Sequence, residues 1–433
     1  MAGSLETHVA SIEDSLIDGM QFSNRLTASY VTSRRSTSFQ PLSGGVFAPN
    51  QLRLIRFQLN DGEGSWLDGS TLRLAFVLSN IGPGYLYPCT NSPASLFRRL
   101  RVLCSGVEVY DCQDYGRCHQ MFSNFIPAQR RAEDACEGWG QSFGALAGDA
   151  GPGGPPQTLT NPVSCCPISP ATGRRMLTPL LCPLFSQGKM LPLSLMAGGI
   201  TVELELGDFY DCFIQHADAQ NQTWAIIQPE LLVDTVSVDP SLSNSYATAL
   251  LGGKSLPISM HNIFSFQSTI ANANAVSIQI ARGFSRLTCV YFSFTRQGER
   301  SNTFFYSPLE GHEPNTDNDT FRWSTQLGGD KQPVYDCRSI SESFMRLRKA
   351  QYIADGMDSL GLMFPRYCTD TFIAAASFER APGTGASHTG VNTMGQNLVL
   401  NLYNCGPHAS TCHVVCHYDA VLNLSSGGAE FLY

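Results

Sequence analysis

The chain has 433 residues, of which 43% are hydrophobic and only 15% are charged, and its formal net charge is -8. The apolar content excludes a disordered chain, and the length favours two domains. The acidic balance excludes a protein that holds nucleic acid over its whole surface, because phosphate neutralisation needs a basic one. The low charge is equally typical of a β-rich protein and of a surface covered by partners.

The N-terminal stretch "MAGSLETHVASIEDSLIDGM" lacks the basic region and apolar core of a secretory signal, and no run of 18 apolar residues follows anywhere. We therefore expect a protein that is not secreted through a signal peptide and whose 15 cysteines are reduced. The cysteines form no C-x-x-C pair, and Cys165 and Cys166 are adjacent, which suits neither a zinc site nor a simple disulfide.

Residues 1–45 are predicted to form an N-terminal arm. A short amphipathic helix is expected near its start, where four apolar residues share one face: Val9, Ile12, Leu16 and Ile17. The polar stretch "TASYVTSRRSTSFQPLSGG" has little periodicity and is typical of an extended tail that a partner orders. Arg34 and Arg35 lie in this tail, and of the arginine pairs in the chain they are the one that we expect to meet an acidic partner.

Residues 46–239 are dominated by strand patterns. Apolar residues alternate with polar ones in "TLRLAFVLSN" and in "GITVELELGD", where Glu203 and Glu205 fall on the face opposite the apolar residues. The stretch "RRLRVLCSGVEVYD" predicts a hairpin that turns at Ser105 and Gly106. Residues 144–170 contain too many Gly and Pro residues for a sheet and predict a long loop between strands.

Residues 240–256 are predicted to link two domains through a short helix that begins near Pro240 and ends at Gly252. Strand patterns resume over residues 257–433. The letters "VYDC" occur at 109–112 and again at 334–337, each time after a strand pattern and before a helix pattern. Because other elements also recur in the same order, we interpret the chain as one β module built twice. This favours an all-β fold of two consecutive jelly-roll domains, that is antiparallel β-sandwiches, with short helices in loops.

Three stretches resemble ligand-binding motifs but lack essential features. "LLGGKSLP" has Thr248 where a phosphate loop needs Gly, and it follows a helix pattern. "CHVVCH", at residues 412–417, places two Cys and two His on opposite strand faces, too few for a structural zinc site. "GHEPNTDND", at residues 311–319, lacks the Gly and the terminal Glu of a calcium loop. We therefore expect no metal and no cofactor.

Sequence motifs of enzyme active sites are absent or not specific. The sequence has no nucleophile elbow and no H-E-x-x-H helix. Glu203 and Glu205 share a strand face, but any solvent-facing pair on an alternating strand does so. We expect no catalytic residues and no enzyme activity, so the protein would act by presenting surfaces.

The most specific stretches are "LTPLLCPLFSQGKMLPLSLMAGGITVELEL" at residues 177–206 and "VDPSLSNSYATALLGGKSLPI" at 238–258. They resemble the double jelly-roll major capsid proteins of polinton-like viruses, virophages and related DNA viruses. "FQPLSGGVFAPNQ" at 39–51 resembles the segment that leads into the first strand of these proteins, and "GVEVYDCQDYGRCHQMF" at 106–122 resembles the helix segment after their hairpin. The resemblance is thin beyond residue 296, and the insertion at 144–170 departs from the family pattern.

The resemblance implies a major capsid protein that self-assembles as pseudo-hexagonal homotrimers and tiles an icosahedral shell in the virion. It implies neighbouring capsomers, penton proteins and minor capsid proteins as partners, assembly inside the host cell, and no small-molecule substrate. The arm at 1–45, with Arg34 and Arg35 as possible inner-face contacts, would then face the genome or an inner membrane. The alternative is a jelly-roll carbohydrate-binding protein or glycosidase-like module, although the chain has only 4 tryptophans for an aromatic platform.

Overall fold

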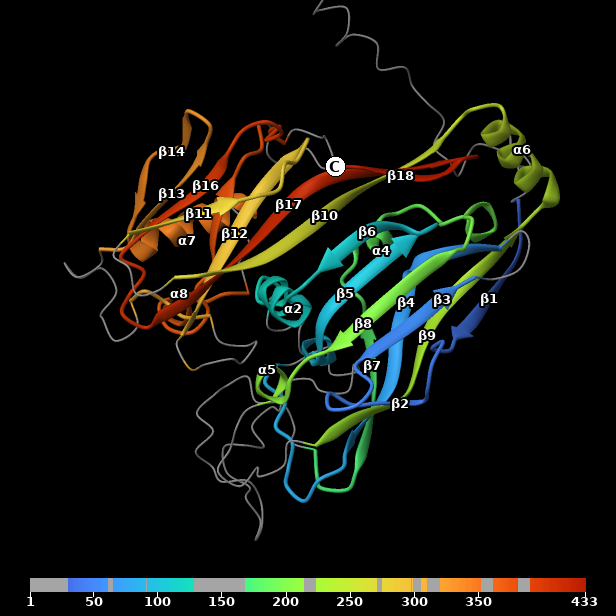
Figure 1. Cartoon of the computed structure of the whole chain (residues 1–433), viewed down its shortest axis with the longest axis horizontal. Helices are drawn as coiled ribbons and strands as arrows, with labels where there is room; N and C mark the ends of the chain where they lie inside the picture. Colours follow the sequence, from blue (N-terminus) through green and yellow to red (C-terminus); the bar gives the residue numbers. More distant parts are fainter. Residues whose placement is uncertain are drawn as a thin grey trace, which may run out of the picture.

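The computed structural model describes eleven stretches of the chain: residues 30–60, 65–90, 92–127, 168–213, 223–270, 275–296, 298, 305–309, 320–351, 361–380 and 390–433. These residues form two β-sandwiches that lie side by side and are joined by a helix at one end (Figure 1). The helix expected in the N-terminal arm and almost all of the Gly/Pro-rich stretch 144–170 lie outside the described residues.

The first sandwich consists of two antiparallel sheets. One sheet has the strand order β1-β9-β4-β7, with β2 also paired to β9, and the other has the order β3-β8-β5-β6. The strands are β1 (Val31–Phe39), β2 (Val46–Phe47), β3 (Leu54–Leu59), β4 (Ser65–Asn80), β5 (Phe97–Cys104), β6 (Val107–Cys112), β7 (Gly173–Pro179), β8 (Ile200–Leu206) and β9 (Trp224–Val238). Short helices occupy the connections: η2 (Pro93–Leu96), α2 (Tyr115–Ser123), α4 (Pro183–Ser186), η4 (Leu193–Leu195) and α5 (Phe209–Cys212).

Helix α6 (Pro240–Leu251) leads into the second sandwich, whose sheets have the orders β10-β17-β12-β15 and β11-β16-β13-β14, with β18 also paired to β17. Its strands are β10 (Leu256–Thr269), β11 (Ala275–Ile280), β12 (Leu287–Arg296), β13 (Arg322–Leu327), β14 (Asp330–Arg338), β15 (Ala374–Ser377), β16 (Leu398–Tyr403), β17 (Ala409–Ser425) and β18 (Gly428–Leu432). The helices α7 (Ser339–Ala350) and α8 (Phe364–Tyr367) lie in its connections.

The two sandwiches have the same topology. In chain order, strands β1, β3, β4, β5, β6, β7, β8 and β9 occupy the places that β10, β11, β12, β13, β14, β15, β16 and β17 occupy in the second sandwich. Both "VYDC" copies lie on the last strand of a hairpin, β6 or β14, and both hairpins lead into a helix, α2 or α7. The prediction of one jelly-roll module built twice in an all-β chain is therefore confirmed.

The local patterns that predicted strands also hold. Strand β8 alternates as expected, and the side chains of Ile200, Val202, Leu204 and Leu206 are fully buried. The predicted hairpin turn lies between β5 and β6, where Ser105 and Gly106 have φ angles of 50° and 81°. Two successive left-handed residues match the twist of the flanking strands, which explains why the chain turns there.

The prediction of a polar tail before residue 46 is wrong for its last part. Residues 31–39 form β1, which pairs along its length with β9 from Val31 opposite Val238 to Phe39 opposite Leu231. The first jelly roll thus begins before residue 46, because β1 is the edge strand of its sheet. An edge strand with mostly exposed side chains needs little apolar alternation, so its sequence resembles that of a loop.

Most of the buried apolar side chains form one continuous cluster that includes residues of both sandwiches. The cluster contains strands from both jelly rolls, and aromatic pairs such as Phe76 with Phe97 and Phe292 with Trp323 lie inside it. Because the two cores are continuous, we treat the sandwiches as one packed unit. No helix in the described ranges is long and apolar enough to span a membrane.

Candidate functional site: the contact between the two jelly rolls

The edge strand β6 of the first jelly roll packs against the edge strand β10 of the second. The side-chain amide of Asn262 donates a hydrogen bond of 2.8 Å to the main-chain carbonyl of Val109, and both residues are buried. Nearby, the Cys112 thiol and the Ser265 hydroxyl are 3.4 Å apart. The two strands belong to different sheets, so side chains rather than a strand ladder make this contact.

Helix α2 of the first jelly roll lies next to the second jelly roll (Figure 1), and its Arg117 contacts the second. Arg117 is only 4% exposed, and its Nη2 donates a hydrogen bond of 3.2 Å to the carbonyl of Phe294 in β12. Its guanidinium also lies 4.7 Å from the centre of the Phe305 ring, a cation–π distance. A buried arginine with these contacts fixes the relative position of the two modules.

Aromatic rings extend the same contact. The ring of Tyr291, in β12, lies 5.7 Å from the ring of Phe122 and 6.0 Å from the ring of Phe125. The Phe122 ring meets Tyr291 edge to face, the geometry that aromatic pairs prefer. The first jelly roll therefore carries both polar and aromatic anchors for the second.

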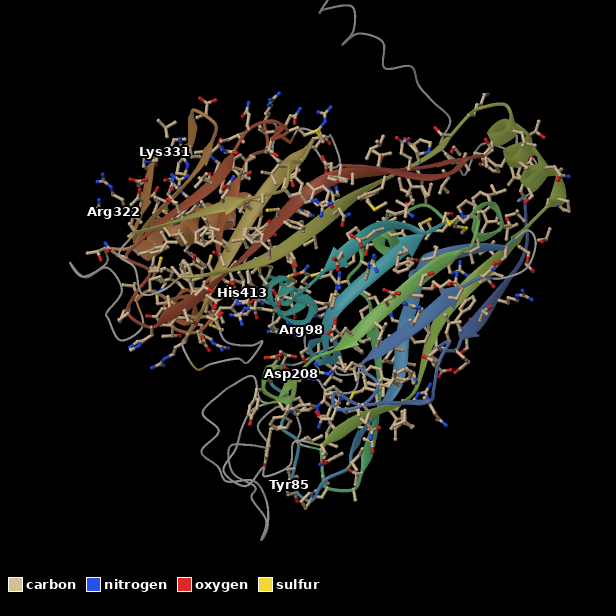
Figure 2. The ribbon with its side chains drawn as sticks, in the orientation of Figure 1. Tyr85, Arg98, Asp208, Arg322, Lys331 and His413 are labelled. Carbon is tan, nitrogen blue, oxygen red and sulfur yellow. The ribbon has the colours of Figure 1, made fainter. Side chains whose placement is uncertain are left out.

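A cavity of about 280 Å³ lies in this contact, and its lining includes Asp114, Arg117, Thr295 and His413. Figure 2 shows His413 at the junction, close to α2. His413 Nε2 is 2.6 Å from the Thr295 hydroxyl, and its Nδ1 is 3.8 Å from Oδ2 of Asp114. The cavity is thus lined by polar groups from both jelly rolls.

The electrostatics of this cavity follow from its burial. Burial lowers the pKa of His413 to about 4, and the positive charge of Arg117 acts in the same direction. Burial acts to raise the pKa of Asp114, but His413, Gln267 and Arg117 outweigh it and hold that pKa below its ordinary value. At neutral pH the cavity therefore holds an ionised Asp114, a charged Arg117 and a neutral His413.

The "CHVVCH" stretch lies on β17, as predicted for a strand. Cys412 and Cys416 are both fully buried. Burial also lowers the pKa of His417 to about 4. Within the described ranges, no three His, Cys, Asp or Glu side chains gather in a way that would hold a metal ion.

The two glutamates weighed as glycosidase carboxylates lie on the outer face of β8, and Glu203 is paired with arginines of both neighbouring strands. Glu203 is 2.7 Å from Arg56 and 3.5 Å from Arg101, which project from the neighbouring strands β3 and β5. Glu205 lies opposite Leu54 and Arg99 in the strand register. This arrangement is a ladder of cross-strand ion pairs, which stabilises a sheet face.

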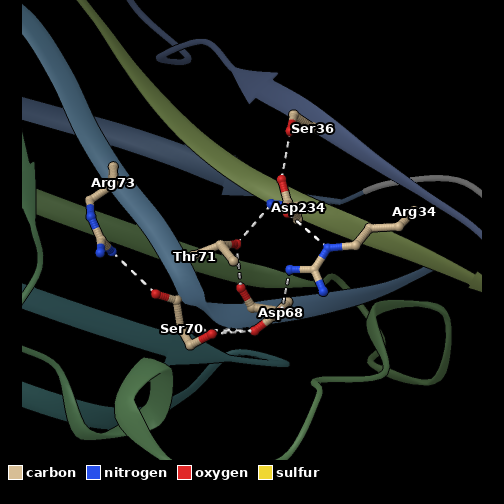
Figure 3. A network of polar contacts seen from close by, with 7 residues as sticks. All are labelled: Arg34, Ser36, Asp68, Ser70, Thr71, Arg73 and Asp234. Carbon is tan, nitrogen blue, oxygen red and sulfur yellow. Dashed lines mark hydrogen bonds and ion pairs between the residues drawn. The ribbon is translucent and has the colours of Figure 1, made fainter.

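Arg34 is held by carboxylates of its own chain (Figure 3). Its Nη2 lies 2.7 Å from Oδ2 of Asp68, and its Nε lies 2.8 Å from Oδ2 of Asp234. Asp234 also accepts a hydrogen bond of 2.6 Å from the Ser36 hydroxyl, and the pKa of Asp234 is lowered by these donors. The network ties β1 to β4 and β9, and nothing in the structure tests the predicted inner-face contact of Arg34 and Arg35.

The "GGKS" stretch does not form a phosphate loop. The "GGKS" letters lie in the turn between α6 and β10, where Gly253 has a φ angle of 81° and the Lys254 amide donates back to the carbonyl of Ala249. This is a helix C-terminus, whereas a phosphate loop precedes a helix. The "GHEPNTDND" stretch lies at 311–319, outside the described residues.

Sequence reasoning missed the residues that make the contact, Arg117 and Asn262 among them. The repeated "VYDC" letters mark the right strand, but they do not show that its two copies differ in environment. Val109 and Tyr110 are 2% and 1% exposed, whereas their counterparts Val334 and Tyr335 are 88% and 61% exposed. Among the described residues, the strand of the first copy contacts β10 of the other jelly roll, whereas Val334 and Tyr335 in the second copy are exposed.

Comparison with solved structures finds the same fold in viral capsids. A chain of the PBCV-1 virus capsid aligns over 95% of this chain and 100% of its own length, with 14% identity and a TM-score of 0.62. The Faustovirus major capsid protein aligns over 97% of this chain and 96% of its own, with 9% identity and a TM-score of 0.56. The mavirus major capsid protein aligns over the same shares, with 8% identity and a TM-score of 0.50.

No protein-family model and no curated protein matches the chain. At such low identity the structural likeness shows the fold alone, but it extends over nearly the whole chain. The chain therefore has the double jelly-roll fold of viral major capsid proteins.

Proposed function

We propose that the chain is a major capsid protein that assembles as pseudo-hexagonal homotrimers, which tile the icosahedral shell of a DNA virus. The observation that carries this proposal is the pairing of two topologically equivalent jelly rolls in one packed unit. Three such chains present six similar modules around a three-fold axis, so a trimer approximates a hexagon that can tile a surface. The fold shared with the capsid proteins of Faustovirus and mavirus supports the same role.

The proposed role is structural and involves no catalysis. The cavity at the junction is lined by groups that hold the two jelly rolls together, including the buried Arg117 and His413. Glu203 is matched by arginines on both neighbouring strands. The protein would reside in the virion, after assembly inside the host cell.

The proposed partners are neighbouring capsomers, penton proteins and minor capsid proteins. The segment that would face the genome or an inner membrane is shorter than the sequence suggested, because residues 31–39 are part of a sheet. Arg34 is engaged by Asp68 and Asp234, so an inner-face contact through Arg34 would compete with two short ion pairs. We therefore propose that residues 1–29 are the part of the arm that faces the genome or an inner membrane.

The competing proposal is a jelly-roll carbohydrate-binding protein or glycosidase-like module. Such proteins use exposed aromatic platforms, but Trp224 and Trp323 are buried to 1% and 0% exposure, and the ring of Trp66 lies 5.4 Å from that of Tyr246. These three tryptophans therefore serve packing.

The test is electron microscopy of the purified full-length chain, with a glycan array on the same sample. We expect three-fold particles with a hexagonal outline, sheets or shells built from them, and no glycan binding. Monomeric particles that bind a glycan would overturn the capsid role in favour of the carbohydrate-binding one.

A further inference from the structure

The two copies of "VYDC" occupy equivalent strands but opposite environments. In β6, the side chains of Val109 and Tyr110 are buried, whereas Val334 and Tyr335 in β14 are 88% and 61% exposed. The cysteine that ends each copy, Cys112 or Cys337, is fully buried in both. The difference between the two copies therefore lies at the Val and Tyr positions and not at the cysteine.

The second jelly roll covers the first copy. Strand β6 is in contact with β10 and β18, and Asn262 of β10 donates its hydrogen bond to Val109 there. Strand β6 is the edge of one sheet of the first jelly roll, and β10 is the edge of one sheet of the second. The contact thus joins the last strand of one module's hairpin to the first strand of the next module.

The strands that are equivalent to β6 and β10 in the other jelly roll are also edge strands. Strand β14 corresponds to β6, and strand β1 corresponds to β10. Within the described part of the chain, no strand pairs with the outer edge of either β14 or β1. Figure 2 shows Lys331, in β14, on the side of the second jelly roll away from the first.

Strand register relates β1 to β10 residue by residue. In the second jelly roll, Asn262 of β10 lies opposite Tyr418 of β17. The next residue of β17, Asp419, binds His261 of β10 at 2.6 Å. In the first jelly roll, Thr37 of β1 lies opposite Val233 of β9. The next residue of β9, Asp234, binds Ser36 of β1. Thr37 therefore occupies in β1 the position that Asn262 occupies in β10. Strand β1 is an edge strand, and most of its side chains are exposed.

We propose that β14 of one chain docks on β1 of a second copy of this chain, and that this contact repeats between chains the contact of β6 with β10 inside the chain. The inference rests on the proposed function, because it names the surfaces that join neighbouring chains in the trimer. The contact is heterologous, since it joins two different surfaces, and heterologous contacts close into rings when their rotation permits.

The chemistry of β14 supports a contact through side chains. Val334 and Tyr335 lie where the register of β14 against β13 is interrupted, so they project from the edge of the sheet. The Arg346 guanidinium lies 5.3 Å from the centre of the Tyr335 ring. Lys331 and Pro333 in the same strand disfavour ladder pairing with another chain, as charged and proline residues do on natural edge strands. The contact of β6 with β10 is likewise made by side chains.

The inference can be tested by photocrosslinking in the full-length chain. Tyr335 is replaced by p-benzoylphenylalanine, half of the chains carry ¹⁵N, and the crosslinked peptides are mapped by mass spectrometry. We expect crosslinks between chains that map to residues 30–41, around β1. A trimer whose crosslinks map elsewhere, or that gives none between chains, overturns the inference but leaves the capsid proposal standing. A wild-type chain that is only monomeric overturns both.

A matched pair of substitutions gives a second measurement. Val334→Asp places a charge in the proposed contact, and Leu251→Asp places one at a similarly exposed apolar residue on α6. Both side chains are exposed in the single chain, so neither change should unfold it. We expect Val334→Asp to raise the concentration at which trimers dissociate at least tenfold, and Leu251→Asp to leave it unchanged. Equal behaviour of the two variants would contradict the proposed contact.

Discussion

Asn262 and Val109 are joined by a hydrogen bond of 2.8 Å although 153 residues separate them in the chain. Asn262 is 1% exposed and Val109 is 2% exposed, so water does not replace this bond when it is lost. The bond links the first strand of the second jelly roll to the "VYDC" strand of the first. It is one of the contacts that join the two modules into the packed unit that the proposed shell tile requires.

We expect Asn262→Ala to lower the free energy of unfolding by about 1–3 kcal/mol, because it leaves the buried carbonyl of Val109 without its donor. Chemical denaturation at fixed protein concentration measures the change. The matched control is Ser277→Ala, which removes an exposed hydrogen bond of 2.7 Å to Asn401 within one sheet. The control should cost no more than about 0.5 kcal/mol. A loss at Asn262 no larger than at Ser277 would show that the junction bond does not hold the modules together.

Stability should fall as the pH is lowered from 6.5 towards 4. Burial lowers the pKa of His119, His413 and His417 to about 4, below the value of 6.5 that applies when they are unfolded. A base with a lowered folded pKa contributes stability that is present above pH 6.5 and is lost as the pH falls through the folded value. The pKa of His261 is raised, mainly by its hydrogen bond to Asp419, and this pair opposes the trend.

Thermal melts of His413→Gln between pH 6.5 and 4 measure how much His413, at the junction, contributes to this loss of stability. His413 faces the cation of Arg117, so its protonation brings two positive charges together beside one carboxylate, Asp114. The variant removes this titration, and its melting temperature should fall less steeply between pH 6.5 and 4. Parallel curves for the variant and the wild type would rule out His413 as a source of the acid sensitivity.

The thiols should be protected in the folded protein. Twelve of the 15 cysteines are described, and all twelve are buried. Burial raises the pKa of Cys182 and Cys289 to about 12, so their reactive thiolate form is rare at pH 8. We expect at most the three remaining cysteines to react with a thiol reagent within minutes at pH 8, and all 15 in guanidinium chloride. Rapid modification of more than three in the native protein would contradict this packing.

Two truncations separate the arm from the sheet. Deletion of residues 1–29 leaves every described strand in place, so the protein should stay soluble with an unchanged melting temperature. Deletion of residues 1–39 removes β1 and exposes the edge of β9, which should lower the melting temperature and cause aggregation. If both truncations behave alike, β1 does not belong to the folded unit. Assembly assays on the shorter deletion then test whether residues 1–29 contact other shell components.

Local patterns in the sequence were sufficient to predict most of the fold. Strand β8 alternates strictly because one of its faces is buried, and the turn at Ser105 and Gly106 needs left-handed residues that its sequence supplies. Strand β1 was missed because an exposed edge strand carries no apolar alternation. The distance in the chain between β1 and β9 leaves no local signal of their pairing.

The junction could not be predicted from the sequence, because neighbouring modules decide it. The four letters "VYDC" are identical in both halves, yet Val109 is buried and Val334 is exposed. Arg117 and Asn262 look like ordinary polar residues of a helix and a strand until their partners, Phe294 and Val109, are brought to them by long-range packing. The relative placement of the two jelly rolls decides which copy is covered and which is exposed.

The most direct test of the capsid proposal is the native mass of the full-length chain, measured by light scattering after size exclusion over a range of concentrations. The account predicts a stable species of three times the 47.2 kDa chain mass. A protein that remains monomeric up to the highest soluble concentration would contradict it.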